Sequence, residues 1–235
     1  MSLLGQGLNF GGFNSGGGAA PFVPSGSPAL WYDATQLTGL NDNDEMDTWE
    51  DFGPDGDTLV PPGPVQKTIY KTGVQNGLPA VRFQDDQRMM RNLSLTNPIT
   101  QPCTVFFTCL QDGGYGYVFD GQNRCGYVGT EDAGGKTELY AGAFLTAAAV
   151  YNKAVWYQGT ATFNGANSSI RINGVEIAAG DAGTNTIGSQ FQIGNYLPGD
   201  STFDWEGYIG EVIVYSGVES PAANEAGLMT KWGIS

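Results

Sequence analysis

The stretch that decides the fold is SSIRINGVEIAAG, residues 168–180. Apolar and polar residues alternate up to Ile172, and the same alternation resumes at Val175. Between them stands Asn173-Gly174, a pair typical of a type I′ turn, because both of its central residues take positive φ. The stretch therefore predicts a β-hairpin whose strands each bury one face.

Other segments of the chain have the composition of β-strands, and the run at 103–110 is continuously apolar, as expected of a central strand. With 36 Gly and 12 Pro among 235 residues, short strands joined by tight turns are expected. That length suits one all-β sandwich. The further predicted strands are ALWYD (29–33), NGLPAVRF (76–83), CTVFFTCL (103–110), YGYVFD (115–120), TELYAGAF (137–144), KAVWYQGTATF (153–163), SQFQIGNY (189–196) and GYIGEVIVYSG (207–217).

One helix is predicted at the end of the chain. Ser220 is a favourable N-cap and Pro221 suits the first helical position. Leu228 and Trp232 lie one turn apart, which gives an apolar stripe to dock on the edge of the sandwich. Gly233 is expected to end the helix.

Residues 1–28 differ from the sandwich predicted over residues 29–235. They are rich in Gly, Ser and Pro, as in a flexible linker, and carry no charged side chain. Large apolar residues are nevertheless spaced along them, which predicts an arm that docks on a neighbouring molecule. The alternative is an arm packed on its own sandwich. The apolar residues of this assembly arm are Leu3, Leu4, Leu8, Phe10, Phe13 and Phe22.

Charge and composition exclude several classes of function. A net charge of −14 and no basic stripe make nucleic acid and anionic membranes poor partners. The absence of His removes Ser-His-Asp triads and imidazole metal ligands. No signal peptide is visible, and no run approaches the roughly 18 apolar residues of a membrane span. We expect synthesis in a cytoplasm and no membrane insertion.

The three cysteines are predicted to be small buried apolar side chains rather than a disulfide framework or a zinc site. Their number is odd and no CxxC motif is present. Cys103 and Cys109 share one predicted strand, which cannot fold back to join them, and Cys125 follows separately. The thiols favour assembly in a reducing cytoplasm.

The order of these segments over residues 29–235 resembles the laminin-G-like / concanavalin A-like lectin/glucanase superfamily, in the version common in bacterial and phage proteins. The resemblance implies an antiparallel two-sheet jelly roll. It also implies adhesion, often to glycans, and in some members a calcium ion, without fixing one ligand. It rests on ALWYDATQLTGL (29–40), Trp49 and Asp51 ahead of Gly53, NGLPAVRFQDDQRM (76–89), SSIRINGVEIAAG (168–180), FQIGN (191–195) and the C-terminal WEGYIGEVIVYSGVESPAANEAGLMTKWGIS (205–235).

An enzymatic alternative rests on Glu45, Asp47 and Glu50, which form E-x-D-x-x-E. This pattern is similar to the catalytic signature of laminarinase-type retaining glycosidases, in which two Glu side chains act as nucleophile and acid. In those enzymes it lies on a mid-domain concave strand. Here it follows soon after the first predicted strand, so an acidic solvated loop is the preferred interpretation, and no catalytic residue is assigned.

Two further hypotheses concern ligands. Calcium would find oxygen ligands in an acidic loop that lacks the full spacing of an EF-hand, and acidic loops for solubility are the preferred alternative. Aromatics near predicted loops would stack on sugars, although aromatics of a sandwich more often belong to its core. The calcium candidates are Asp42, Asp44, Asp55 and Asp57, with Asp47 a further oxygen donor, and the aromatic candidates are Trp49, Tyr115, Tyr117, Tyr127, Tyr196 and Trp205.

The preferred functional hypothesis is a non-enzymatic structural protein of a bacteriophage virion, in capsid decoration or in a tail or fibre. The arm would bind other virion proteins or copies of the chain itself, and the sandwich would face outward toward a host-surface glycan. No cofactor is expected apart from the calcium considered above. The alternatives are a carbohydrate-binding module of a cellular or secreted protein and, third, a laminarinase-type glycosidase.

Overall fold

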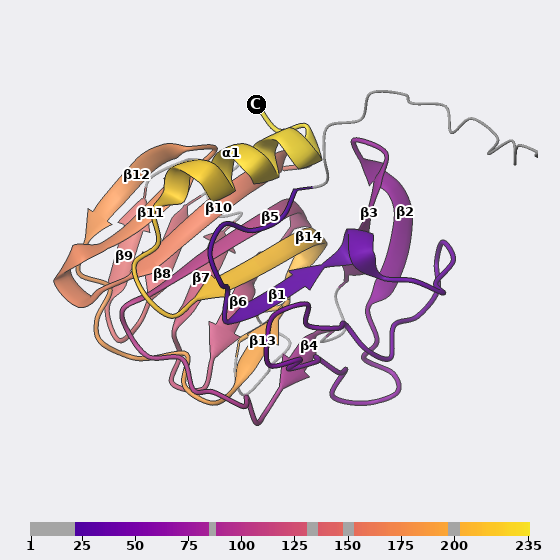
Figure 1. The fold of residues 1–235 in the computed structure, drawn as a ribbon, viewed down its shortest axis with the longest axis horizontal. Helices are drawn as coiled ribbons and strands as arrows, with labels where there is room; N and C mark the ends of the chain where they lie inside the picture. Colours follow the sequence, from indigo (N-terminus) through magenta and orange to yellow (C-terminus); the bar gives the residue numbers. More distant parts are fainter. Residues whose placement is uncertain (1–21, 85–87, 131–135, 148–152, 197–202) are drawn as a thin grey trace, which may run out of the picture.

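The fold is a sandwich of two antiparallel β-sheets with one C-terminal helix (Figure 1). The computed structural model describes residues 22–84, 88–130, 136–147, 153–196 and 203–235. Within them, the all-β sandwich and the C-terminal helix predicted from the sequence are confirmed.

The larger sheet has eight strands in the order β12-β11-β10-β5-β14-β3-β2, with β1 pairing β14 beside this path. Its strands are β1 (Leu30–Asp33), β2 (Ile69–Gln75), β3 (Leu78–Phe83), β5 (Cys103–Gly113), β10 (Trp156–Phe163), β11 (Ser168–Ile172), β12 (Val175–Gly180) and β14 (Glu206–Tyr215). The smaller sheet has six strands in the order β4-β13-β6-β7-β8-β9. They are β4 (Met90–Asn92), β6 (Tyr115–Gly121), β7 (Gly126–Thr130), β8 (Thr137–Tyr140), β9 (Phe144–Ala147) and β13 (Phe191–Ile193). Two short 3-10 helices, η1 (Ala34–Gln36) and η2 (Gly165–Asn167), lie in connections.

Strand β5 shows why its sequence is apolar without alternation. Val105 and Phe107 point into the core between the sheets, whereas Phe106 points to the opposite face. That opposite face is covered by helix α1 (Pro221–Trp232), so both faces of β5 are buried. The three cysteines are free and buried, and Cys103 and Cys109 share β5 as predicted.

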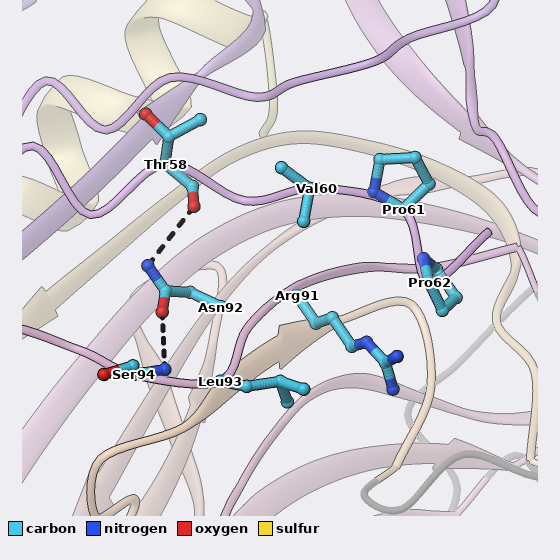
Figure 2. Close-up of a pocket in the computed structure, with 8 residues that line it drawn as sticks. All are labelled: Thr58, Val60, Pro61, Pro62, Arg91, Asn92, Leu93 and Ser94. Carbon is cyan, nitrogen blue, oxygen red and sulfur yellow. Dashed lines mark hydrogen bonds between the residues drawn. The ribbon is translucent and has the colours of Figure 1, made fainter. Parts of the chain in front are cut away.

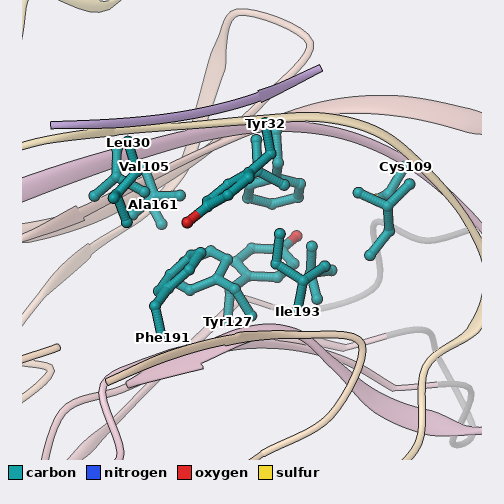
Figure 3. Packing of buried hydrophobic residues seen from close by; sticks show 14 of the residues in the cluster. Leu30, Tyr32, Val105, Cys109, Tyr127, Ala161, Phe191 and Ile193 are labelled. Atoms are coloured by element: carbon teal, nitrogen blue, oxygen red, sulfur yellow. The ribbon is translucent and has the colours of Figure 1, made fainter. Parts of the chain in front are cut away.

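The main core fills the space between the sheets. Figure 3 shows side chains of the larger sheet, among them Tyr32 and Val105, facing Tyr127 and Phe191 of the smaller sheet. The rings of Tyr32 and Phe191 stack with centroids 6.0 Å apart. Apolar burial of this extent is the main source of stability in such a fold.

Helix α1 lies across the outer face of the larger sheet rather than at the edge of the sandwich, which corrects the prediction from its apolar stripe (Figure 1). Trp232 stacks on Trp156 of β10 with centroids 5.3 Å apart. Gly210 of β14 makes room for the indole ring, since a Cβ there would lie 2.3 Å from it. Gly233 ends the helix as predicted, whereas Ser220 is the N-cap residue but forms no side-chain capping bond.

The decisive hairpin is confirmed as β11 and β12. Asn173 and Gly174 have φ of 48° and 77°, as a type I′ turn requires. One predicted strand was wrong, because the segment 137–144 covers β8, a turn at residues 141–143 and only the first residue of β9. Strands β2, β4 and β7 were not predicted.

Candidate functional site

Of the six aromatic residues considered as sugar-stacking platforms, Tyr115 is half-buried and the other five are buried. Trp49, Tyr127 and Trp205 are fully buried in the main core. Burial of Trp49 anchors the loop that carries the W-x-D motif. Asp51 of that motif accepts hydrogen bonds from the backbone N–H groups of Trp31, Gly53 and Asp57, so the motif holds the loop against β1.

The acidic loop that suggested a glycosidase is a solvated loop in the structure. Glu45, Asp47 and Glu50 are exposed, while Met46 and Trp49 between them are buried. Asp47 forms an ion pair with Lys67, with 2.7 Å between Oδ1 and Nζ. The loop lies outside the regular strands, and it is joined to β2 by an isolated bridge between residues 45 and 69 and by backbone hydrogen bonds of Tyr70 to Asn43 and Asp44.

The four calcium candidates each accept hydrogen bonds from protein donors. Asp42 accepts from the backbone N–H of Thr72 and from the ammonium of Lys71. Asp57 accepts from the N–H and hydroxyl of Thr96. Asp44 bonds to Asn41, and Asp55 to Asn97. Within the described residues, no three His, Cys, Asp or Glu side chains are grouped as a metal site.

The described end of the arm lies on the helix. The Phe22 ring packs against Gly227 of α1. The Ser25 N–H donates to Asn224 Oδ1 at 2.9 Å, and the Tyr215 hydroxyl donates to the Ser25 carbonyl at 2.6 Å. Leu3, Leu4, Leu8, Phe10 and Phe13 lie outside the described residues, so the assembly role of the arm stays a prediction.

The outer face of the smaller sheet carries a polar row that the sequence did not reveal. Arg91 of β4 is the cross-strand partner of Gln192 on β13, which is the partner of Asp120 on β6. Such partners point to the same face, and their neighbours Met90 and Phe191 point into the core. Gln192 is fully buried, and its Oε1 has no hydrogen-bond partner among the described residues.

Beyond this row, an aromatic cluster lies on the same face. It contains Tyr117 and Tyr196, both less than a tenth exposed, with Phe203 packed on them. The guanidinium of Arg124 lies over the Tyr196 ring, 5.1 Å from its centroid. Burial, followed by the nearby charge of Asp120, raises the pKa of Tyr117 well above its ordinary value, so its phenol is neutral. The cluster acts as a second, smaller core.

At the β4 end of the row lies an open pocket of about 430 Å³, which we call the Arg91 pocket (Figure 2). Backbone hydrogen bonds of 2.9 and 2.8 Å join Val60 to Arg91 at the edge of the sheet. These bonds fix the backbone at the base of the pocket. Asn92 joins its two walls, donating to the Thr58 carbonyl and accepting from the Ser94 N–H. The residues that line the pocket are Thr58, Val60, Pro61, Pro62, Arg91, Asn92, Leu93 and Ser94.

The pocket combines three kinds of surface. Val60 and Leu93 are 46% and 47% exposed, and together with two prolines they give a rigid apolar wall. The Thr58 and Ser94 hydroxyls have no hydrogen bond to other described residues. Arg91 adds a cation. One feature of the sequence could have indicated this pocket. It is the Pro61-Pro62 pair between predicted strands, which is typical of a stiff loop.

Within the described residues, no helix is long and apolar enough to cross a membrane.

Solved structures with this fold include proteins of different kinds, and none of those named here exceeds 15% sequence identity. A heptameric SAP-like pentraxin from Limulus polyphemus matches with a TM-score of 0.51 at 15% identity, over 66% of this chain and 81% of the other. Trypanosoma rangeli sialidase matches with a TM-score of 0.54 at 14% identity, over 92% of this chain but 34% of the sialidase. A GH54 α-L-arabinofuranosidase matches with a TM-score of 0.60 at 11% identity, over 89% of this chain and 59% of the enzyme.

Family membership rests on the sequence itself. No curated protein matches the chain. The family model Laminin_G_3, described as the concanavalin A-like lectin/glucanases superfamily, matches residues 96–223, which is more than half of the chain. These residues span β5 to the first turn of α1 and include the hairpin at 168–180. The chain therefore belongs to the concanavalin A-like lectin/glucanases superfamily.

Proposed function

We propose that this chain is a non-enzymatic adhesive domain that binds a saccharide in the Arg91 pocket. The observation that carries the proposal is the composition of that pocket. Its volume of about 430 Å³ suits a ligand of one or two sugar rings, since binding sites for small molecules span roughly 300–1,000 Å³. Apolar walls contact the C–H faces of a sugar ring, and free hydroxyls bond its hydroxyl groups.

A glycan array tests the proposal with the full chain and a pocket-filling variant. Ser94 is exposed at the rim, so Ser94→Trp fills the pocket without disturbing the core. Val175→Trp is the matched control, because Val175 is 63% exposed on β12 and does not line the pocket. We expect glycan binding by the wild type and by Val175→Trp, and its loss in Ser94→Trp. Absence of binding to any glycan would overturn the proposal.

The non-enzymatic part of the proposal is supported by the exposed position of Glu45 and Glu50. Retaining glycosidases hold their two carboxylates about 5–5.5 Å apart across a bound substrate, and an open loop gives no such enclosure. The test is incubation with β-glucan followed by assay of reducing ends, which we expect to remain unchanged. Hydrolysis that disappears in Glu45→Gln would identify an enzyme instead.

A second candidate function is that of a structural protein of a phage virion, assembled through the arm. The favouring observation is the uncharged segment 1–28 with its spaced apolar residues, of which Phe22 is packed on α1. Apolar segments that lack charge suit insertion between neighbouring subunits. Incorporation into particles is compared for the full chain and for a chain that starts at Ser27. Equal incorporation would refute a role of the arm.

A further inference from the structure

We propose that the Arg91 pocket selects acidic sugars, with the guanidinium of Arg91 binding the sugar carboxylate. The inference rests on the proposed saccharide binding and adds the chemical class of the ligand. It begins from the position of Arg91 in the sheet. Backbone bonds to Val60 on one side and the pairing with Gln192 on the other fix the Cα of Arg91 in a regular ladder. The side chain therefore leaves the sheet from a rigid base.

Arg91 is the arginine whose guanidinium has no partner among the described residues. Arg82 and Arg171 form ion pairs with carboxylates. Arg88 donates to a backbone carbonyl, and Arg124 lies over an aromatic ring. In a chain with 24 acidic and 10 basic residues, a half-buried guanidinium that forms no ion pair with a carboxylate of the described residues is unexpected from composition alone. It is available to an anion supplied by a ligand.

The shape of the guanidinium favours a carboxylate. Its planar N–H donors match the two oxygens of a carboxylate in a bidentate pair, which a Lys ammonium does not reproduce. The walls beside it decide the rest of the ligand. Val60 and Leu93 are apolar and exposed, and Thr58 and Ser94 line the end of the pocket away from the guanidinium (Figure 2). A ring with an apolar face, several hydroxyls and one carboxylate satisfies all three surfaces, and that ring is a sugar acid.

The long-range field of the protein works against this ligand, which makes the local arrangement decisive. The net charge of −14 repels anions in general, and salt at physiological strength screens it beyond about 8 Å. Direct contact with Arg91 lies inside that distance. Affinity for the acid is therefore expected to be retained or to rise slightly between 0.05 and 0.3 M salt, because added salt screens the repulsion by distant carboxylates more than the direct contact with Arg91.

The test compares each sugar acid with its own methyl ester, which removes the charge and leaves the ring. Calorimetric titration of the full chain uses trigalacturonate and sialyllactose, each with its methyl-esterified form. Charge-assisted hydrogen bonds contribute about 1.5–3 kcal/mol, or roughly 10- to 150-fold in affinity. We expect at least one acid to bind about tenfold or more tightly than its ester. Arg91→Gln should abolish that difference, and Arg91→Lys should restore only part of it.

The control is Lys71→Gln, which removes one positive charge outside the pocket and should leave the preference unchanged. Thermal unfolding of each variant establishes that it is folded. Equal affinity for acid and ester, with binding still lost in Ser94→Trp, would overturn the acid selectivity and leave the proposed function standing. Failure of every saccharide to bind would overturn both. A preference for the acid that survives Arg91→Gln would also refute the assignment of Arg91.

Discussion

Replacing Lys231 by Met should leave two buried carboxylates of the larger sheet without the ammonium group of α1 that compensates their charge. Lys231 Nζ donates to Asp33 Oδ2 and Glu211 Oε2, both at 2.7 Å, and both carboxylates are almost completely buried. Glu211 also accepts from the indole N–H groups of Trp31 and Trp232, at 2.8 and 3.1 Å. The indoles remain in the variant, but the compensating positive charge is lost.

The magnitude follows from burial. Removing one partner of a buried ion pair costs about 3–5 kcal/mol, because the remaining charge stays uncompensated in a poorly solvated site. The unfolding free energy of Lys231→Met should fall by that amount at pH 8. The matched control is Lys71→Met, which breaks the exposed pair with Asp42 and should leave stability nearly unchanged. Urea unfolding followed by tryptophan fluorescence measures both variants.

The loss should depend on pH. Burial first, and the nearby charge of Asp33 second, raise the pKa of Glu211 from 4.5 to about 7. A carboxyl with a raised pKa stabilises the fold most below its unfolded value, and that contribution disappears as pH rises through about 7. Each pKa unit corresponds to about 1.4 kcal/mol, so the wild type should lose up to about 3 kcal/mol between pH 4.5 and 8 from this group.

In Lys231→Met the pKa of Glu211 should rise further, so at pH 5 the carboxyl is protonated and the penalty of the substitution is small. The difference in unfolding free energy between Lys231→Met and the wild type should therefore be larger at pH 8 than at pH 5. Equal losses at both pH values, or a loss at pH 8 no greater than that of Lys71→Met, would refute the reasoning.

Two further predictions concern packing around the helix. Gly210→Ala should lower the unfolding free energy by about 1–3 kcal/mol, because the new Cβ would lie 2.3 Å from the Trp232 ring; Gly63→Ala, which would approach only the end of a flexible side chain, is the control, and equal melting temperatures would contradict the prediction. Tyr215→Phe removes the hydrogen bond to the Ser25 carbonyl and the one accepted from the Asn224 amide, and should cost about 1–3 kcal/mol. It should also speed proteolysis ahead of β1, and an unchanged cleavage rate would show that the Tyr215 hydroxyl does not hold the segment.

Local patterns predicted those parts of the fold whose cause is local. Asn173-Gly174 specified its hairpin because a type I′ turn restricts the residues that can form it. The continuous apolar run of β5 predicted a central strand. It did not indicate that helix α1 covers the outer face of β5. The packing of Trp232 on that face depends on the space left by Gly210, a residue that resembles any other glycine in a strand.

The strands that escaped prediction have weak local signals. Strand β2 is interrupted by the exposed residues Thr72 and Gly73, and the φ of Gly73 is 64° at an irregular pairing with β3. Strand β7 contains Gly126 and Gly129, which suggest a turn in isolation. A Cβ at Gly126 would lie 2.7 Å from the Phe119 carbonyl, so these glycines instead allow close packing within the sheet. The requirement comes from neighbouring strands and is invisible in one segment.

The candidate site was invisible for a related reason. Residues that drew attention as motifs, such as Trp49 and Asp51, hold a loop on the core, because conspicuous side chains are as useful for packing as for chemistry. Arg91 belonged to no motif. Its environment is created by the ladder that places Gln192 beside it and by the bridge to Val60, which are long-range pairings. Strand register specifies which side chains share a face, so in a sandwich a binding surface is a property of the pairing and becomes readable only with the structure.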